Sequence, residues 1–119
     1  MLKIGNLKIS SKEEPKLISE ISANHAGKIS IAMKLVRLAA KNGSDLIKLQ
    51  TYGPEGMTLN SNKPEFVIKD KKSLWYKRNL FDLYSEGRTP REWHYKLFKE
   101  AKKYNVKCFT SIFDENDIE

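Results

Sequence analysis

Apolar residues alternate along this chain between runs typical of strands and spacings typical of helices. Residues 16–22 form a short apolar run that indicates a buried strand. The apolar positions of residues 31–40 then recur at intervals of three and four, as one buried face of a helix requires. After Gly43, a typical helix terminator, residues 45–51 form a second apolar run. The segment 16–51 is therefore predicted to be one βαβ unit with parallel strands and a right-handed crossover.

The alternation resumes after a long connection over residues 52–73, of a kind that is either functional or disordered. Residues 74–84 and 90–104 have helical spacing, and residues 106–111 indicate a third strand. This order is that of an α/β protein. Three parallel strands cannot close a barrel. We therefore expect residues 1–119 to be one domain, the amino-terminal portion of a (β/α)8 TIM barrel, which needs roughly 250 residues.

Single residues mark where these elements begin. Gly5-Asn6 is a strong turn dipeptide between two short apolar stretches and predicts an N-terminal β-hairpin over residues 2–10. Ser30 is the expected N-cap of the first helix, Thr89 that of the later helix, and Asp114 that of a further one. Since an N-cap side chain accepts a hydrogen bond from the first turn, each assignment fixes where a helix starts.

Charge and composition change this picture little. The formal net charge is +7 at pH 7, with 31% charged and 39% hydrophobic residues. The surplus lysines are scattered, which leaves open a solvated surface, attraction of an anionic small substrate, or nucleic-acid binding. No apolar run approaches 18 residues and no secretory signal is recognised, so no membrane span is expected. Cys108 is the only cysteine, which excludes an intrachain disulfide and leaves the cytoplasm as the expected location.

Charged and polar side chains stand in the first two predicted strands, where burial makes them costly without a partner. Glu20 lies near the end of the first strand, and two interpretations stay open: a substrate or metal ligand at the mouth of a barrel, or a carboxylate paired with Lys48. Lys48 and Gln50 share one face of the second strand, because strand side chains alternate with period two. An inward lysine suits a phosphate or carboxylate, and the alternative is a lysine whose ammonium reaches water.

Other candidates are weaker on pattern alone. Asn24 and His25 follow the first strand, where a histidine is either a site residue or a structural one, and His94 is expected to be a surface or packing residue. Thr110 and Ser111 place hydroxyls at the end of the third strand, where hydroxyls can bind an anion. Four aromatic side chains are expected to pack rather than to stack on bases: Trp75, Phe81, Tyr84 and Trp93.

Several stretches together resemble the sialic acid synthase family, and within it the pseudaminic acid synthase branch. They occur in the order and at the spacing of that family over nearly the whole chain. The stretches are Glu20-Ile21-Ser22-Ala23-Asn24-His25-Ala26-Gly27, Lys48-Leu49-Gln50-Thr51-Tyr52, Met57-Thr58-Leu59, Leu74-Trp75, Leu80-Phe81-Asp82-Leu83-Tyr84 and Thr89-Pro90-Arg91-Glu92-Trp93-His94. Each stretch alone is weak, and the combination is specific.

This resemblance implies a barrel that condenses phosphoenolpyruvate (PEP) with an N-acetylated amino sugar. In the family a divalent metal (Mn, Mg or Co) activates the sugar aldehyde, C3 of PEP attacks it, water adds at C2, and phosphate leaves by C–O cleavage. Carried over by motif, the expected catalytic residues are Glu20, which contacts the sugar near the metal, and Lys48, which binds PEP. The further expected substrate-binding residues are Gln50, Ser111, Asn24 and His25, the last two at the rim of the site.

Two positions depart from the family pattern, and part of the family's machinery is expected elsewhere. Ile112 stands where proline usually follows the hydroxyl residue, and Tyr76-Lys77 replaces an acidic-glycine pair in a loop that approaches the sugar. The metal-binding histidines, the rest of the barrel and a C-terminal antifreeze-like domain, which completes the site across a homodimer, are expected beyond residue 119. This part alone is therefore expected to bind no metal and to turn over no substrate.

Two other functions stay open. Another phosphate-binding (β/α) barrel enzyme would share Lys48 but not the combined motifs. A small basic nucleic-acid-binding module would bind generic oligonucleotides in a salt-dependent way, whereas stabilisation by PEP would favour either enzyme. The resemblance favours a PEP-dependent nonulosonic acid synthase, a transferase of carbohydrate biosynthesis without nucleic-acid or membrane partners.

Overall fold

A three-stranded parallel sheet forms the centre of the fold. The computed structural model describes residues 1–118. The sheet contains β3 (Ile18–Glu20), β4 (Leu46–Thr51) and β5 (Lys107–Ile112), in that spatial order. Chain order and spatial order coincide because each crossover lays the next strand beside the last. The predicted parallel strands are confirmed.

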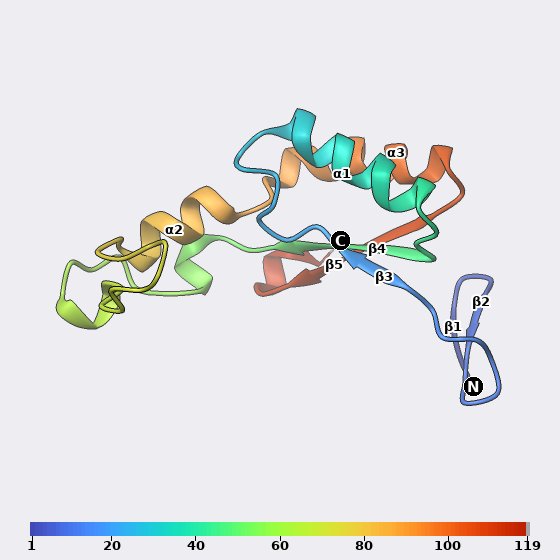
Figure 1. The fold of residues 1–119 in the computed structure, drawn as a ribbon, viewed down its shortest axis with the longest axis horizontal. Helices are drawn as coiled ribbons and strands as arrows, with labels where there is room; N and C mark the ends of the chain where they lie inside the picture. The colour runs from blue at the N-terminus through green and yellow to red at the C-terminus, as the bar shows by residue number, and fades with distance from the viewer. Residues whose placement is uncertain (119) are drawn as a thin grey trace.

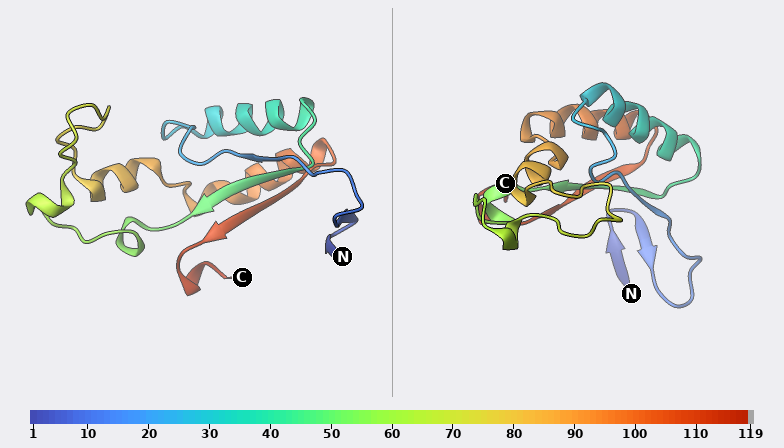
Figure 2. Two further views of the ribbon diagram at one scale, coloured as in Figure 1. Left: turned by 60° about the horizontal axis from the view of Figure 1, so that its bottom comes forward. Right: turned by 60° about the vertical axis from the view of Figure 1, so that its left-hand side comes forward.

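Two helices cover one face of this sheet. α1 (Ile29–Lys41) connects β3 to β4, and α3 (His94–Lys103) leads into β5. The two helices contact each other and lie side by side over the strands (Figures 1 and 2). Within the described part of the chain, the other face of the sheet carries no helix. The two faces of β4 therefore have different surroundings, apolar toward the helices and open on the opposite side.

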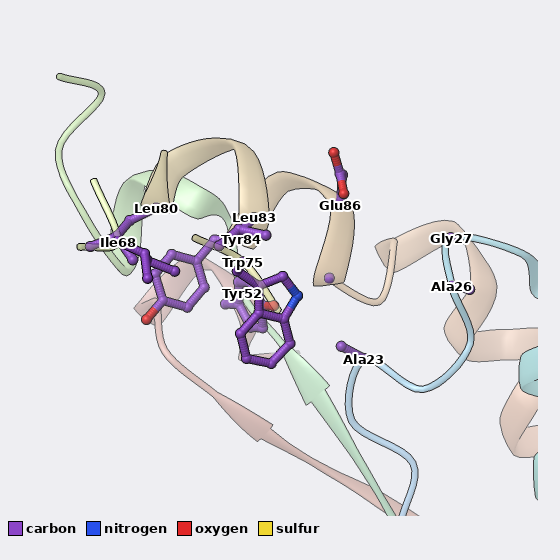
Figure 3. A pocket seen from close by; sticks show the side chains of 11 residues that line it. Ala23, Ala26, Gly27, Tyr52, Ile68, Trp75, Leu80, Leu83, Tyr84 and Glu86 are labelled. Carbon is purple, nitrogen blue, oxygen red and sulfur yellow. The ribbon is translucent and has the colours of Figure 1, made fainter. Parts of the chain in front are cut away.

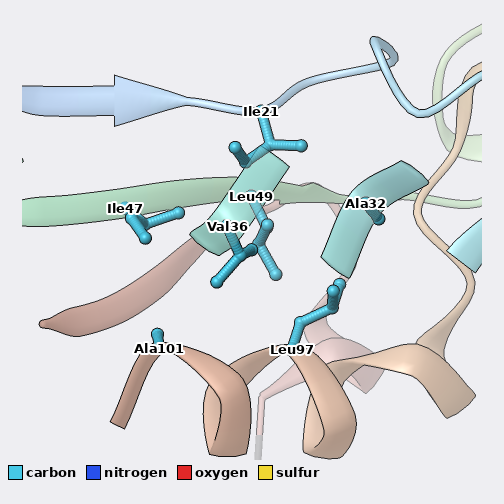
Figure 4. Packing of buried hydrophobic residues seen from close by; sticks show 7 residues of the cluster. All are labelled: Ile21, Ala32, Val36, Ile47, Leu49, Leu97 and Ala101. Carbon is cyan, nitrogen blue, oxygen red and sulfur yellow. The ribbon is translucent and has the colours of Figure 1, made fainter. Parts of the chain in front are cut away.

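The hydrophobic core fills the space between sheet and helices, as Figure 4 shows. Ile47 and Leu49 of β4 are fully buried and belong to one cluster with Val36 of α1 and Leu97 of α3. Burying one such side chain contributes about 1.5–3 kcal/mol. The alternation that turns Ile47 and Leu49 toward the helices turns Lys48 to the open face, as predicted.

A buried carboxylate fixes α1 against α3. Glu100 accepts hydrogen bonds from Arg37 at 2.5 Å and from Lys103 at 2.7 Å, and its side chain is 3% exposed. The Lys103 and Arg37 cations lower the pKa of Glu100 below its ordinary value. Because Arg37 belongs to α1 and Glu100 to α3, this pair defines how the two helices sit over the sheet.

The predicted N-terminal hairpin is confirmed. β1 (Leu2–Ile4) and β2 (Leu7–Ile9) pair antiparallel, and Gly5 takes the left-handed conformation of the turn, with φ +60°. A Cβ at Gly5 would overlap the side chain of Lys107. The hairpin therefore lies against the amino end of β5, away from the carboxyl ends of the strands (Figure 1).

The connection from β4 to α3 differs from the prediction. It contains three 3-10 turns, Pro54–Gly56, Pro64–Phe66 and Arg91–Trp93. Its helix α2 (Leu80–Gly87) begins six residues later than the predicted start at 74. Lys77 has φ +65°, which a helix does not tolerate, and the side chain of Asn79 accepts from the backbone N–H of Phe81 at 2.8 Å. A left-handed residue followed by an N-cap therefore sets the later start.

Two predicted caps are wrong and one is confirmed. α1 begins one residue before Ser30, and its N-cap Lys28 makes no side-chain bond. α3 is entered through a 3-10 turn, Arg91–Trp93, so Thr89 is not its cap. Asp114 does cap an element, the short 3-10 turn Glu115–Asp117, by accepting from Asn116. In the described part of the chain, every helix falls short of the length and apolar character needed to cross a bilayer.

Candidate active site at the carboxyl ends of the strands

Three polar side chains meet on the open face of the sheet. Nζ of Lys48 lies 3.0 Å from Oε2 of Glu20, and Gln50 donates to Oε1 of Glu20 at 2.9 Å. Ser22 donates to the same Oε1 at 3.1 Å. The register makes this possible, because Glu20 and Lys48 are direct neighbours across β3 and β4. Of the two interpretations of Glu20, pairing with Lys48 is the arrangement observed.

Ser111 lies beside this cluster, and Asn24 lies in the loop after β3. Ser111 is half-buried and is the register partner of Gln50 across β4 and β5, so it extends the same sheet face. Asn24 is exposed, and its amide donates to the carbonyl of Ile21 at 2.9 Å, which folds the loop after β3 back on the strand. The structure thus links Lys48 and Gln50 through Glu20 and places Ser111 on the neighbouring strand, whereas Asn24 bonds within its own loop.

The cluster is an ion pair that is partly open to solvent. The Lys48 ammonium lowers the pKa of Glu20, with smaller contributions from Ser22 and Gln50. The side chains of Lys48 and Glu20 are 28% and 38% exposed, so a solute can reach both. An ammonium has three N–H groups, so Lys48 can donate to a phosphate or carboxylate as well as to Glu20.

His25 lies beneath its loop. Its side chain is fully buried, and its ring packs edge-on against Trp93 with centroids 5.3 Å apart. The backbone N–H of Gly27 donates to Nδ1 at 3.1 Å, so the proton is on Nε2, which faces the hydroxyl of Thr89 at 3.4 Å. Burial lowers the pKa of His25. These contacts agree with the interpretation of His25 as a structural residue, which holds the loop after β3.

A hydrogen-bonded chain behind the sheet was not predicted. Thr51 Oγ1 lies 2.6 Å from Nε2 of His94 and 2.7 Å from Oγ1 of Thr110. Nδ1 of His94 is 3.0 Å from the carbonyl oxygen of Arg91, which only accepts, so Nδ1 carries a proton. In the tautomer that carries this proton on Nδ1, Nε2 accepts from the Thr51 hydroxyl. The sequence does contain one indication of this chain. Strand alternation turns Thr51 and Thr110 toward the helices, and buried hydroxyls there need hydrogen-bond partners.

A small hollow of about 280 Å³ lies beside this chain and is lined by Arg91, Asp117 and Phe98 among others. The carboxylate of Asp117 is 1% exposed and forms an ion pair with Nε of Arg91. Neither residue was a candidate from sequence. The pair joins the turn after β5 to the start of α3, which is a structural contact.

The larger cavity opens at the carboxyl end of β4 (Figure 3) and measures about 790 Å³. Its wall is mostly apolar and aromatic and comes from the loop after β3, the long connection and α2. The residues that line it include Ala23, Tyr52, Ile68, Trp75, Leu83, Tyr84 and Gly87. Trp75 and Tyr84 were expected to be packing residues, and no sequence pattern distinguishes this wall from a core.

The described residues do not form a complete metal centre. Within residues 1–118 no three metal-ligating side chains gather. Glu20, the one carboxylate in the cluster, already bonds Lys48 through Oε2 and Gln50 through Oε1. The expectation that metal-binding histidines lie beyond residue 119 concerns residues outside the described part, so it stays a prediction.

Comparison with known proteins identifies the family. The NeuB family profile matches residues 35–119. A pseudaminic acid synthase of Campylobacter jejuni (strain 81-176) is 45% identical over 118 residues, 99% of this chain and 33% of that protein. A pseudaminic acid synthase of Helicobacter pylori is 40% identical, over 90% of this chain and 31% of that protein. The chain thus spans about a third of the length of the curated relatives it matches.

A solved structure agrees at the level of the fold. The N-acetylneuraminic acid (sialic acid) synthetase of Leptospira borgpetersenii superposes with a TM-score of 0.77 at 22% identity, over 98% of this chain and 35% of that one. At that identity the likeness establishes a shared α/β fold only. The family match covers most of the chain and the strands that carry Lys48, Gln50 and Ser111. The chain belongs to the NeuB family.

Proposed function

We propose that this chain carries the PEP-binding part of a nonulosonic acid synthase, which condenses PEP with an N-acetylated amino sugar. One observation supports this most: the contacts of Glu20 with Lys48 and Gln50 at the carboxyl ends of parallel strands, in a chain 45% identical to a pseudaminic acid synthase. Active sites of α/β proteins lie at this end of the strands.

Each residue has a role in the proposal. Lys48 binds the phosphate or carboxylate of PEP through its remaining N–H groups, and Gln50 and Ser111 supply neutral donors beside it. Glu20 faces the sugar. Asn24 lies at the rim, and His25 acts on the site by holding the loop that carries Asn24.

The proposed reaction joins C3 of PEP to the aldehyde carbon of the sugar, forming one C–C bond. Water adds its oxygen at C2, and the C–O bond to phosphate breaks, so inorganic phosphate leaves. A divalent cation would polarise the aldehyde oxygen. Residues 1–118 do not hold a full ligand set for it. The steps assigned to Lys48, Gln50 and Ser111 do not depend on it.

The architecture of the whole protein is also a proposal. We take β3, β4 and β5 as the first strands of a (β/α)8 barrel, because they are parallel, consecutive and covered by helices on one face. Further strands, an antifreeze-like domain and a homodimer in the cytoplasm would complete the enzyme. The chain by itself should then release no phosphate from PEP.

A chimeric enzyme tests this function directly. Residues 1–118 would replace the matching third of the Campylobacter pseudaminic acid synthase, and phosphate release from PEP and the sugar substrate of that enzyme would be measured. The chimera is expected to be active. Lys48→Ala should abolish activity by removing the cation for PEP, whereas Leu74→Ala, at a side chain 96% exposed, should leave it unchanged.

The result can go against the proposal in two ways. A chimera that folds with the circular dichroism and melting temperature of the parent enzyme, yet releases no phosphate, would mean that this chain lacks a working site. A Lys48→Ala chimera with unchanged kcat and KM for PEP would remove Lys48 from the proposal.

A further inference from the structure

We propose that His94 is a positioning residue, which fixes the side chains of Gln50 and Ser111 for the substrate without touching it. His94 acts through the hydroxyls of Thr51 and Thr110, which it holds together on the helix-facing side of the sheet. This inference rests on the proposed function, which assigns Gln50 and Ser111 to PEP binding, and deepens it by one residue that the reaction itself does not use.

The register of the sheet links the two threonines to the site. Gln50 is the register partner of Ser111 across β4 and β5. Thr51 comes next on β4 and Thr110 comes one position earlier on β5, so the two are diagonal neighbours. Their Oγ1 atoms lie 2.7 Å apart. Because strand side chains alternate between faces, this bond on one face fixes the backbone from which Gln50 and Ser111 project on the other.

His94 gives the hydroxyls a single direction. With Nδ1 donating to the carbonyl of Arg91, Nε2 accepts the only proton of the Thr51 hydroxyl, across 2.6 Å. The Thr51 oxygen then accepts from Thr110. Without the imidazole, Thr51 would be free to donate to Thr110. The Thr110 hydroxyl would then turn to the backbone carbonyl of Ser111, which lies 3.2 Å away. The effect of His94 therefore reaches the strand end that carries Ser111.

The segment before α3 attaches to the chain beyond the other two strands as well. Trp93 packs edge-on against His25, in the loop after β3. Arg91 forms an ion pair with Asp117, in the turn after β5. With the bond from His94 to β4, residues 91–94 thus contact the carboxyl end of each strand or the residues that follow it. His94 is therefore held in place by its neighbours and can fix the distance between β4 and β5.

Steady-state kinetics of the chimeric enzyme test the inference through two substitutions of His94. His94→Leu removes the acceptor for Thr51, whereas His94→Gln can place its Oε1 where Nε2 lies and keeps an acceptor. His94→Leu should raise the KM for PEP at least about tenfold and change kcat less than about threefold, because Gln50 and Ser111 are assigned to binding. His94→Gln should return the KM to within about threefold of the unaltered chimera.

A control variant separates positioning from a general loss of stability. Arg37→Met removes a cation from the buried carboxylate of Glu100, so it should lower the melting temperature, but Arg37 has no part in the hydrogen-bonded chain. Its KM for PEP should stay within about twofold of the unaltered chimera. An equal rise in KM in Arg37→Met and His94→Leu would overturn the inference. So would an unchanged KM in His94→Leu, or a His94→Gln chimera with the KM of His94→Leu.

Two further results keep this inference separate from the proposed function. An inactive Lys48→Ala chimera beside a His94→Leu chimera with unchanged KM would retain the PEP site and reject the positioning. A parent chimera that releases no phosphate would reject the proposed function, and hydrogen exchange at the amides of residues 49–52 and 110–113 would then decide on His94. Exchange at least about fivefold faster in His94→Leu, but not in Arg37→Met, would support the positioning, and equal exchange would overturn it.

Discussion

Nε2 of His94 lies 2.6 Å from Oγ1 of Thr51 and ties helix α3 to the end of strand β4. The hydroxyl of Thr51 also lies 2.7 Å from that of Thr110. In the sequence, Thr51 directly follows Gln50 and Thr110 directly precedes Ser111. Gln50 and Ser111 lie on the open side of the ends of β4 and β5. The hydrogen-bonded chain therefore fixes the same two strand ends from the side that faces the helices.

Thr51→Val should destabilise the chain by about 1–3 kcal/mol, because it leaves Nε2 of His94 and the hydroxyl of Thr110 without their buried partner. Urea unfolding followed by circular dichroism measures this. Thr51→Ser keeps the hydroxyl and is the matched control, with a smaller loss. A loss in Thr51→Val no larger than that in Thr51→Ser would show that the hydroxyl stabilises this position no more than the methyl group does.

Helix capping gives a second comparison. Asn79→Ala should cost about 1 kcal/mol, because the Asn79 side chain accepts from Phe81 at the start of α2. Ser30→Ala should change the free energy of unfolding by less than about 0.5 kcal/mol, because Ser30 caps nothing and is exposed. Chemical denaturation of both variants checks the order, and a larger loss for Ser30→Ala would contradict it.

His25 should make stability depend on pH. Burial lowers its pKa below the ordinary value of 6.5, so the unfolded chain binds this proton more readily than the folded one. The contribution of neutral His25 is complete above pH 6.5 and is lost as pH falls toward the lowered folded pKa. Melting temperatures between pH 7.5 and 5.5 should therefore fall more steeply for the unaltered chain than for His25→Gln.

Two further results complete the test of His25. His25→Gln should also be less stable at pH 7.5, because it removes the edge-on contact with Trp93. Parallel melting curves for both proteins across the pH range would mean that His25 does not take up a proton on unfolding in this window.

Cys108 should be chemically inert in the folded chain. It lies on the helix-facing side of β5, where burial raises its pKa to about 12. Since only the thiolate reacts, labelling by iodoacetamide at pH 8 should be at least about 100-fold slower in buffer than in 6 M guanidinium. Glutathione in the same two solutions controls for the effect of denaturant on the reagent. Equal labelling rates would show that β5 opens readily.

The sequence determines the sheet and the faces of its strands more clearly than it determines the long connection. Period-two alternation in β4 is enough to separate Ile47 and Leu49 from Lys48 and Gln50, because one face is covered by helices. Gly5 supplies the left-handed turn of the hairpin. Both signals are local, so they are readable without knowing the tertiary structure.

The features that were missed are set by contacts between distant residues. His94 and Thr51 are 43 residues apart in sequence, and the residues around each of them do not indicate that the two are in contact. Likewise α2 starts later than predicted because Lys77 has a left-handed backbone conformation. A lysine side chain gives no indication of that conformation. The cavity wall joins residues 23 and 87, and only the folded chain brings them together.

The position of α2 has an evolutionary consequence. This helix and its connection join the rest of the molecule at the ends of the sheet and contribute nothing to the buried cluster between β4, α1 and α3. Insertions or replacements there would spare the hydrophobic core, as is usual for variable loops on a rigid scaffold. Changes in this one connection could therefore alter ligand specificity during evolution, while the charged groups on the strands stay in place.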